Sequence, residues 1–546
     1  MLIVLAHLVF AQLTLIIAVA LFLTGKATRW RPSWLVVPAV AGAVWTLAVG
    51  PRAAAAGFAE GPARVLSYLS ASGRQAGHLL HPGAAFAGAG RWLPEQLPLA
   101  VLTGVAEAAL ATWLSWLHTD EWNLPKPRPG LLVALRRLAL VRMMRAGGIV
   151  TRDGVCLGIA PDSAARVTLS WREAAGGVLV CGSVPELRGT SLQLVHAALR
   201  RRKPVVAVDL TGDQDMASQF AAACAAAGVP LQVFGGARDA AAGREPACYE
   251  PFRHGTAAHR AALVTGMLSW DGPRAQHRRG CAAYLEDVFE LLDAAPGDPR
   301  VPVLDEVLYL LDPVALRARV RHVPASYPRR RVLTERIMVS ARLAEAEPAA
   351  TTALAAELKA LRTSQAGRWL RQPVGGGLAS LDLGRTVAAR AAALFCLGGP
   401  GDPAGRAMLS RLVGQDLLGL GARLRGMGVD GDGIVWLAGC QAIPGPMLAD
   451  LIAAGPVTGL AVLATTWSAQ AAGELAELPN ALVVHRVADP GTARRLAAVA
   501  STEAPAAVTA DDLHSLGDGE FLLAVTRPWR LVPRAFAVRA RARDGA

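Results

Sequence analysis

Three long apolar runs dominate the first part of the chain, at residues 2–24, 33–50 and 97–117. Each is long enough to cross a bilayer as a helix, because about 20 apolar residues span the hydrocarbon core. Glu107 is the one Asp, Glu, Lys or Arg within them, and it indicates an inward-facing contact or a functional intramembrane carboxylate. The first run is followed by basic residues rather than a small-residue cleavage site, which argues against a removable signal peptide. We therefore expect residues 1–117 to be a membrane anchor with three spans.

Basic residues set the expected orientation of these spans. Lys26, Arg29 and Arg31 lie between the first two runs, and a second basic stretch covers residues 123–152. Short loops rich in Lys and Arg stay in the cytoplasm. Both stretches are cytoplasmic only with three spans and an external N-terminus. This predicts a multi-pass protein of the cytoplasmic membrane with a large cytoplasmic domain. The alternative has two spans, with 97–117 lying on the membrane.

Residues 118–165 follow the apolar runs and are predicted to be a basic juxtamembrane linker. Their Pro-rich stretch 125–130 indicates a stiff connection. Residues 131–145 have the pattern of a basic helix, either lying on anionic headgroups or solvated.

From residue 166 onward, short runs of Val, Leu and Ala alternate with Ala-rich helical patterns, which is typical of a buried parallel sheet. The predicted strands are 178–181, 205–209, 231–234, 392–397, 434–437, 460–464 and 482–485, with a late edge strand at 521–525. Residues 257–375 lack strand patterning. We expect an α/β domain in two parts, 166–256 and 376–546, separated by a helical insertion at 257–375.

Composition adds little to this organisation. The net charge of +13 and the pI of about 10.1 permit contact with nucleic acid or anionic lipid. Hydrophobic residues make up 53% of the chain, which agrees with a membrane region. The seven cysteines form no C-x-x-C pair, so free thiols in a reducing compartment are the simplest interpretation.

The stretch 176–213 has the order of a P-loop fold: a buried strand, a Gly-bounded turn, a helix and a second buried strand. A working loop reads G-x-x-x-x-G-K-[ST], in which Lys reaches the outer phosphates and the hydroxyl holds Mg²⁺. With Gly189 as the second Gly, Val184 replaces the first Gly, Thr190 replaces the Lys, and Ser191 keeps the hydroxyl. The first motif is therefore degenerate.

The acidic motif that should follow a later strand is missing as well. Such strands end in carboxylates that hold Mg²⁺ and polarise the attacking water, whereas 434–437 continues into Ala-Gly-Cys-Gln. Asp430 and Asp432 precede this strand, at the end opposite to where α/β sites collect. Asp305 and Glu306 form an acidic pair after apolar residues, but they fall in the predicted helical insertion.

This order of elements resembles the FtsK/HerA superfamily of DNA-pumping motors, and within it the type IV secretion coupling proteins of conjugative DNA transfer. Asp209, Gly212 and Asp213 match the family's D-x-K-G-[DE] motif, with Thr211 in place of its Lys. Three further segments match more loosely: 249–253, the strand 460–468 with Thr466 in place of Gln, and 480–486 followed by Asp489.

The resemblance implies a membrane anchor, a RecA-like P-loop NTPase-type parallel sheet with an all-α insertion, and a hexameric assembly. It also implies ATP and Mg²⁺ as cofactors and DNA as a possible partner. By the same resemblance, the candidate nucleotide-binding residues are Gly182, Gly189, Thr190, Ser191 and Asp209. The alternative interpretation of Gly182, Gly189 and Ser191 is a tight strand–helix turn with a helix N-cap.

Three arginines are candidates for a residue that acts in trans on a neighbouring subunit: Arg423, Arg425 and Arg486. No catalytic residue and no metal ligand is assigned from the sequence.

Hydrolysis is predicted to be impaired, because four kinds of catalytic group are missing from the motifs: the Walker lysine, the lysine replaced by Thr211, the carboxylate pair, and the Gln replaced by Thr466. Groups of this kind each stabilise transition-state charge. The leading hypothesis is a membrane-anchored FtsK/HerA-like pseudo-ATPase that acts in conjugative or type IV secretion-like transfer, in a homo-hexamer or beside an active paralogue. One alternative is an active DNA-translocating ATPase with a non-standard site. The other is a membrane-bound nucleotide-binding scaffold.

Overall fold

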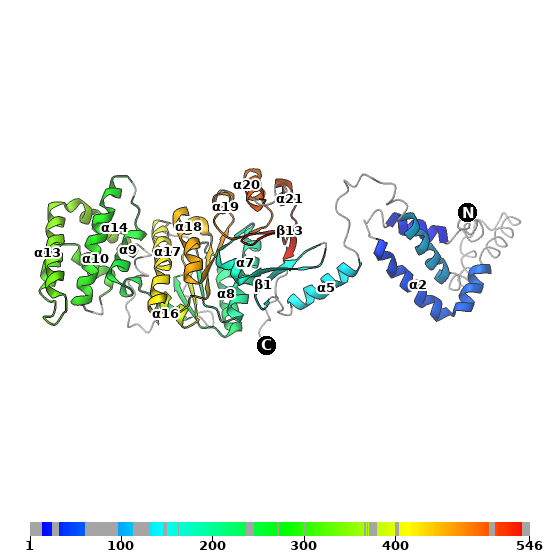
Figure 1. Ribbon diagram of the computed structural model, residues 1–546, viewed down its shortest axis with the longest axis horizontal. Coiled ribbons are helices and arrows are strands. Elements are labelled where there is room, and N and C mark those ends of the chain that lie inside the picture. The colour runs from blue at the N-terminus through cyan, green and yellow to red at the C-terminus, as the bar shows by residue number, and fades with distance from the viewer. Residues whose placement is uncertain are drawn as a thin grey trace. The chain divides into compact units, whose positions relative to one another are not determined.

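The computed structural model describes residues 14–24, 32–60, 97–112, 131–145, 150–161, 163–235, 245–270, 272–298, 301–364, 367, 370, 379–398, 403–501 and 508–537, and all structural statements concern these residues. The chain forms two compact units (Figure 1). One comprises Met1–Leu140 with Pro161–Ala164, and the other Val141–Ala160 with Ala165–Ala546.

The first unit is helical in its described parts. Its helices are Thr14–Thr24, η1 (Pro32–Leu35), α2 (Val36–Val49), Pro51–Glu60 and Leu97–Thr112. Glycines lie where helices meet: a Cβ on Gly104 would come within 2.9 Å of Ile17, and one on Gly42 within 3.1 Å of Val101. The three predicted apolar segments therefore contact one another through small residues.

Among the described residues, no single helix is both long and apolar enough to cross a membrane. Val36–Val49 and Pro51–Glu60 meet that test only as a pair, bent by 103°. Residues 2–13 of the first predicted span and 113–117 of the third lie outside the described residues. So do residues 118–130 of the predicted linker.

The second unit is built on one sheet, which has thirteen strands among the described residues, in the order β2-β1-β13-β12-β11-β3-β10-β9-β4-β8-β5-β6-β7. From β11 to β7 all neighbours are parallel, and the pairs among β12, β13, β1 and β2 are antiparallel, as is β12 with β11. The strands are β1 (Gly154–Ile159), β2 (Arg166–Ser170), β3 (Val178–Cys181), β4 (Val205–Asp209), β5 (Leu231–Gly235), β6 (Glu245–Tyr249), β7 (Ala379–Leu381), β8 (Ala392–Cys396), β9 (Gly433–Ala438), β10 (Leu460–Thr466), β11 (Ala481–Val484), β12 (Glu520–Thr526) and β13 (Trp529–Ala537).

Helices connect the strands and cover both faces of the sheet. Before the insertion they are α6 (Trp171–Ala175), α7 (Val184–Arg200), α8 (Gln214–Ala227) and η3 (Pro251–Arg253), whereas α5 (Leu131–Arg145) precedes the first strand. After it they are α16 (Leu383–Ala388), α17 (Pro403–Gly426), η5 (Cys440–Ala442), α18 (Gly445–Thr458), α19 (Ala469–Leu475), α20 (Pro490–Ala500) and α21 (Ala510–His514).

Two hydrophobic cores lie on the two faces of this sheet. Successive strand residues point to opposite faces; Val178 and Val180 of β3 belong to the core with α7 and α8, and Leu179 and Cys181 to the core with α17 and α18. All four residues of β3 are buried, as expected for a central parallel strand. The predicted mixed α/β fold with a parallel sheet is confirmed.

Helices alone fill the insertion in its described residues. They are α9 (Ala257–Met267), η4 (Gly272–His277), α10 (Arg278–Ala294), α11 (Val303–Leu310), α12 (Pro313–Val320), α13 (Arg330–Ala346) and α14 (Pro348–Thr363). They project from one end of the sheet, with α13 outermost (Figure 1).

Two details of the sequence interpretation are wrong. The late strand β12 is not an edge strand, because β11 and β13 pair with it on either side. β1 lies in the stretch expected to be linker, yet it is fully buried and pairs with β2 and β13.

Candidate functional site

The central parallel strands end at one place on the sheet, and the predicted nucleotide-binding residues surround it. β3, β10, β9 and β4 are consecutive neighbours. Their last residues are in register, with Cys181 opposite Thr466 and Ala438 opposite Asp209. The loops that follow these strands therefore converge where α/β proteins usually bind ligands.

The connection between β3 and α7 is too short for a phosphate-binding loop. Only Gly182 and Ser183 separate Cys181 from Val184, the first residue of α7. A phosphate loop needs a longer turn whose N–H groups converge on the anion. Gly182 allows close packing of this junction against β11, since a Cβ there would lie 2.6 Å from that of His485.

A carboxylate of the chain itself lies at the start of α7. Glu186 accepts hydrogen bonds from the backbone N–H of Ser183 at 3.1 Å and from its hydroxyl at 2.7 Å. Helix N-termini favour negative charge, which is why phosphates bind there in working loops. In this chain Glu186 supplies that charge from within.

Gly189, Thr190 and Ser191 all lie within α7 rather than ahead of it. Ser191 is fully buried, and its hydroxyl donates to the carbonyl oxygen of Leu187 at 2.6 Å. The hydroxyl predicted to hold Mg²⁺ therefore bonds to its own helix.

Thr190, which stands in place of the Walker lysine, contacts a buried histidine. Its hydroxyl oxygen lies 2.9 Å from Nε2 of His485, and Nδ1 of that ring lies 2.9 Å from the carbonyl oxygen of Glu520. Because a carbonyl only accepts, Nδ1 carries the proton, and Nε2 of the neutral ring accepts from Thr190. Thr190 thus links α7 to β11.

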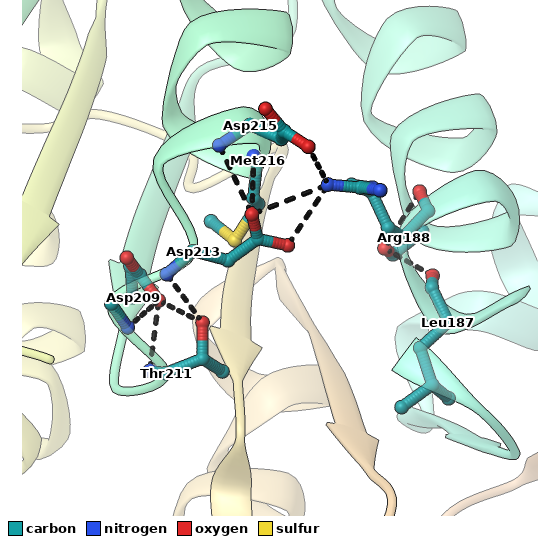
Figure 2. Close-up of polar contacts among 9 residues, drawn as sticks. Leu187, Arg188, Asp209, Thr211, Asp213, Asp215 and Met216 are labelled. Carbon is teal, nitrogen blue, oxygen red and sulfur yellow. Dashed lines mark hydrogen bonds and ion pairs between the residues drawn. The ribbon is translucent and has the colours of Figure 1, made fainter. Parts of the chain in front are cut away.

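Asp209 closes the turn after β4 instead of facing a ligand. It is 2% exposed, and one carboxylate oxygen accepts from the N–H of Thr211 at 2.8 Å, its hydroxyl at 2.6 Å and the N–H of Gly212 at 3.0 Å (Figure 2). Burial raises the pKa of Asp209 above its usual value, against the opposing effect of these hydrogen bonds.

Arg188 is the residue that sequence reasoning missed. Its guanidinium lies 3.2 Å from both carboxylate oxygens of Asp213 and 2.9 Å from that of Asp215 (Figure 2). Asp213 also caps α8 by accepting from the backbone N–H groups of Asp215 and Met216. Arg188 is the one cation in the sequence 182–191, which is the signal that could have drawn attention to it. Its charge is balanced within the chain.

Close packing fills the space beyond β9. Gly439 has φ 78°, and a Cβ there would lie 2.8 Å from Thr211 and 3.2 Å from the ring of Trp467. A cavity of about 30 Å³ lies between α7, the end of β9 and Trp467. One water needs roughly 10–15 Å³ on such a measure, so a triphosphate does not fit. In the part of the chain that the structure describes, no three His, Cys, Asp or Glu side chains gather as metal ligands would.

The acidic pair in the insertion is structural. Asp305 and Glu306 lie in the first turn of α11, where carboxylates are favourable. Glu306 pairs with Arg319 at 2.5 Å, and Asp305 lies 3.7 Å from Arg362.

Arg423 is engaged inside its own chain. It pairs with Asp416, which is 1% exposed and accepts from the hydroxyl of Tyr249 at 2.7 Å. His259 of α9 lies 3.4 Å from the same carboxylate. Burial, with Asp416 beside it, raises the pKa of Tyr249 well above its usual value. This cluster joins the helical insertion to α17.

Arg425 and Arg486, the other two arginines predicted to act in trans, are exposed. Arg425 lies near the end of α17, and Arg486 follows β11.

Comparisons with known proteins give structural matches only. No family model matches the chain, and no curated protein matches it. Solved structures of the bacterial conjugative coupling protein TrwB are similar to it at 14% sequence identity, covering 74% of this chain and 94% of that one. The TM-score is 0.44 for the unbound monoclinic form and 0.45 for the complex with ADP and Mg²⁺.

Proposed function

We propose that the chain is a subunit of a conjugative or type IV secretion-like transfer machine that does not hold or hydrolyse a nucleotide at the β3–α7 junction. The observation that carries this proposal is the start of α7 at Val184, directly after Gly182 and Ser183. A cradle of backbone N–H groups has no room there, and Glu186 already takes the position favourable to an anion.

The groups that an active motor would need support the same proposal. Ser191 would have to hold Mg²⁺, and Asp209 or Asp213 would have to supply a carboxylate. Each of these side chains is occupied by hydrogen bonds or ion pairs within the chain. Recruiting them would require these internal hydrogen bonds and ion pairs to break, so the geometry favours a non-hydrolysing subunit over an active motor or a nucleotide-binding scaffold.

Membrane anchoring is the second part of the proposal. Residues 1–117 form the anchor with spans at 2–24, 33–50 and 97–117, and the part of 118–165 that precedes β1 forms the basic connection to the cytoplasmic part. The contacts of Gly42 and Gly104 support this, because helices in a bilayer associate through small residues.

The remaining parts are a RecA-like domain at 166–256 and 376–546, the helical insertion at 257–375, and assembly in a hexamer, alone or with an active paralogue. Arg425 and Arg486 are exposed, which suits a role in trans on the neighbouring subunit. DNA is the proposed cargo.

Mg-ATP binding tests the central point. Calorimetry on the full-length chain in lipid nanodiscs should show no saturable binding up to about 1 mM ATP. A Kd of about 1 mM corresponds to a binding free energy of about −4 kcal/mol. Ser191→Ala serves as the matched variant and should behave identically. Saturable binding to the unmodified chain that weakens in Ser191→Ala would overturn the proposal, as would ATP turnover that this substitution abolishes.

A further inference from the structure

Two unpartnered surfaces lie on the helical insertion, on different helices. One is an apolar stripe on α13 formed by Val332, Val339 and Leu343, which are 61%, 53% and 64% exposed. Their spacing of seven and four residues places them on one face of the helix. The opposite face of α13, which includes Ile337, is buried in the insertion.

Among the described residues, none covers these three side chains, and α13 is the last helix at its end of this unit in Figure 1. Exposed valine and leucine side chains in a row are unusual on a charged helix and mark contact surfaces. The stripe is about 16 Å long at 1.5 Å per residue.

The second surface is a groove between α9 and α10. It is open to solvent and has a volume of about 350 Å³. Ala258 and Ala262 from α9 and Ala282 from α10 line it. Small side chains on both walls let another helix approach closely, and the Val and Leu side chains of α13 have the size to fill the space above them.

Charges at the two ends of the groove differ in sign. Glu286 lies toward one end, and Arg278 and Arg279 lie at the other, where α10 begins. All three side chains are exposed. A helix that lies in this groove should therefore carry basic residues at one end and acidic residues at the other.

The charge pattern of α13 is complementary to that of the groove. Arg329, Arg330 and Arg331 are exposed at its start, and Glu345 and Glu347 are exposed at its end. Glu345 pairs with Arg317 of its own chain, whereas Glu347 extends past the last residue of α13.

We propose that α13 of one copy lies in the α9–α10 groove of a second copy, with the arginine end near Glu286 and the glutamate end near Arg278 and Arg279. Each copy then offers one surface and receives the other. Such a heterologous contact repeats from copy to copy and closes into a ring or continues as a filament. The contact involves none of the residues around the β3–α7 junction, so it does not depend on the nucleotide question.

Cysteine cross-linking tests which surfaces meet. Full-length chains with Val339→Cys are mixed with full-length chains with Ala262→Cys and oxidised. Disulfide-linked dimers are expected in the mixture only, above the level given by the unmodified chain with its seven free cysteines. Linked dimers from Val339→Cys alone would mean that α13 packs against α13 and would overturn the groove as its site. Absence of linked dimers in every sample would overturn self-association through these surfaces.

Charge reversal provides an independent test. Arg279→Glu should weaken association by at least about tenfold, because it places a glutamate of the groove opposite the glutamate end of α13. Glu347→Arg in the other copy should restore it. Arg494→Glu, an exposed reversal on α20, is the control and should have no effect. Equal effects of Arg279→Glu and Arg494→Glu, or no rescue by Glu347→Arg, would overturn the proposed orientation.

Discussion

The polar side chains around the β3–α7 junction form hydrogen bonds and ion pairs within the chain. Thr190 donates to His485, Ser191 bonds to its own helix, and Arg188 is balanced by Asp213. The missing Walker lysine was predictable from the motif spacing. The partners were not, because His485 lies 295 residues from Thr190 and its burial depends on the packing of β11 against α7.

Asp209 offers a test at this scale. Because the pKa of Asp209 is raised in the folded state above the usual 3.8, the folded chain holds this proton more tightly than the unfolded chain. The resulting stabilisation is complete below pH 3.8 and is lost as the pH rises through the raised value. Asp209→Asn keeps the accepting oxygen and carries no charge. It should unfold at a higher temperature than the unmodified chain near neutral pH, and the difference should shrink as the pH falls toward about 4.

Calorimetric unfolding at several pH values measures this difference. The structurally matched control is Asp213→Asn, which removes an ion pair with Arg188 rather than a buried charge. A difference for Asp209→Asn that stays constant or grows on acidification would contradict the expected burial effect.

At the scale of elements, the predictable strands were the ones buried on both faces. β3, β4, β8 and β9 are short runs in which Val, Leu, Ile and Ala predominate. β13 escaped prediction because its sequence includes Pro533 and two arginines and its residues are half exposed. β6 includes Glu245 and Pro246, β7 has three residues, and β1 follows a basic stretch that suggested a linker.

The start of α7 is the element that decides the site, and the sequence left two interpretations of it open. The S-x-x-E spacing of Ser183 and Glu186 is that of a capping box, and it could have predicted that α7 begins at Val184. The motif comparison drew attention to Gly189 and Ser191 instead.

Removal of this cap should be measurable. Glu186→Ala leaves the N–H and hydroxyl of Ser183 without their acceptor and should lower the free energy of unfolding by about 0.5–2 kcal/mol. Glu186→Gln retains an accepting oxygen and should lose less. Denaturant titrations monitored by circular dichroism compare the two. Equal losses would indicate that the charge, rather than the hydrogen bond, stabilises the start of α7.

At the scale of the whole unit, the helical insertion is held to the sheet by a buried charged cluster. Asp416 of α17 accepts a hydrogen bond from Tyr249 at the end of β6 and pairs with Arg423 of the same helix. His259 of α9 lies beside the same carboxylate. The insertion was predictable from its lack of strand patterning. Its attachment was not, because Arg423 was predicted to act in trans on a neighbouring subunit, whereas its side chain is 14% exposed and pairs with Asp416.

Loss of Asp416 should loosen this attachment. Asp416→Ala removes the main partner of the buried Arg423 side chain. Such a loss typically lowers the free energy of unfolding by about 3–5 kcal/mol. Glu335→Ala breaks the exposed pair Arg331–Glu335 and should cost less than about 1 kcal/mol. Thermal unfolding followed by limited proteolysis compares the variants, and earlier cleavage within 257–375 is expected for Asp416→Ala. Similar losses in the two variants would rule out the cluster as the attachment.

The position of β13 in the sheet determines when β1 and β2 can join the sheet during synthesis. Among the described strands, β1 and β2 join the sheet only through β13, which leaves the ribosome after all the others. The hairpin of β1 and β2 therefore stays outside the sheet until hundreds of later residues have been made. Until β13 pairs with it, the second edge of β1 has no strand partner among the described strands.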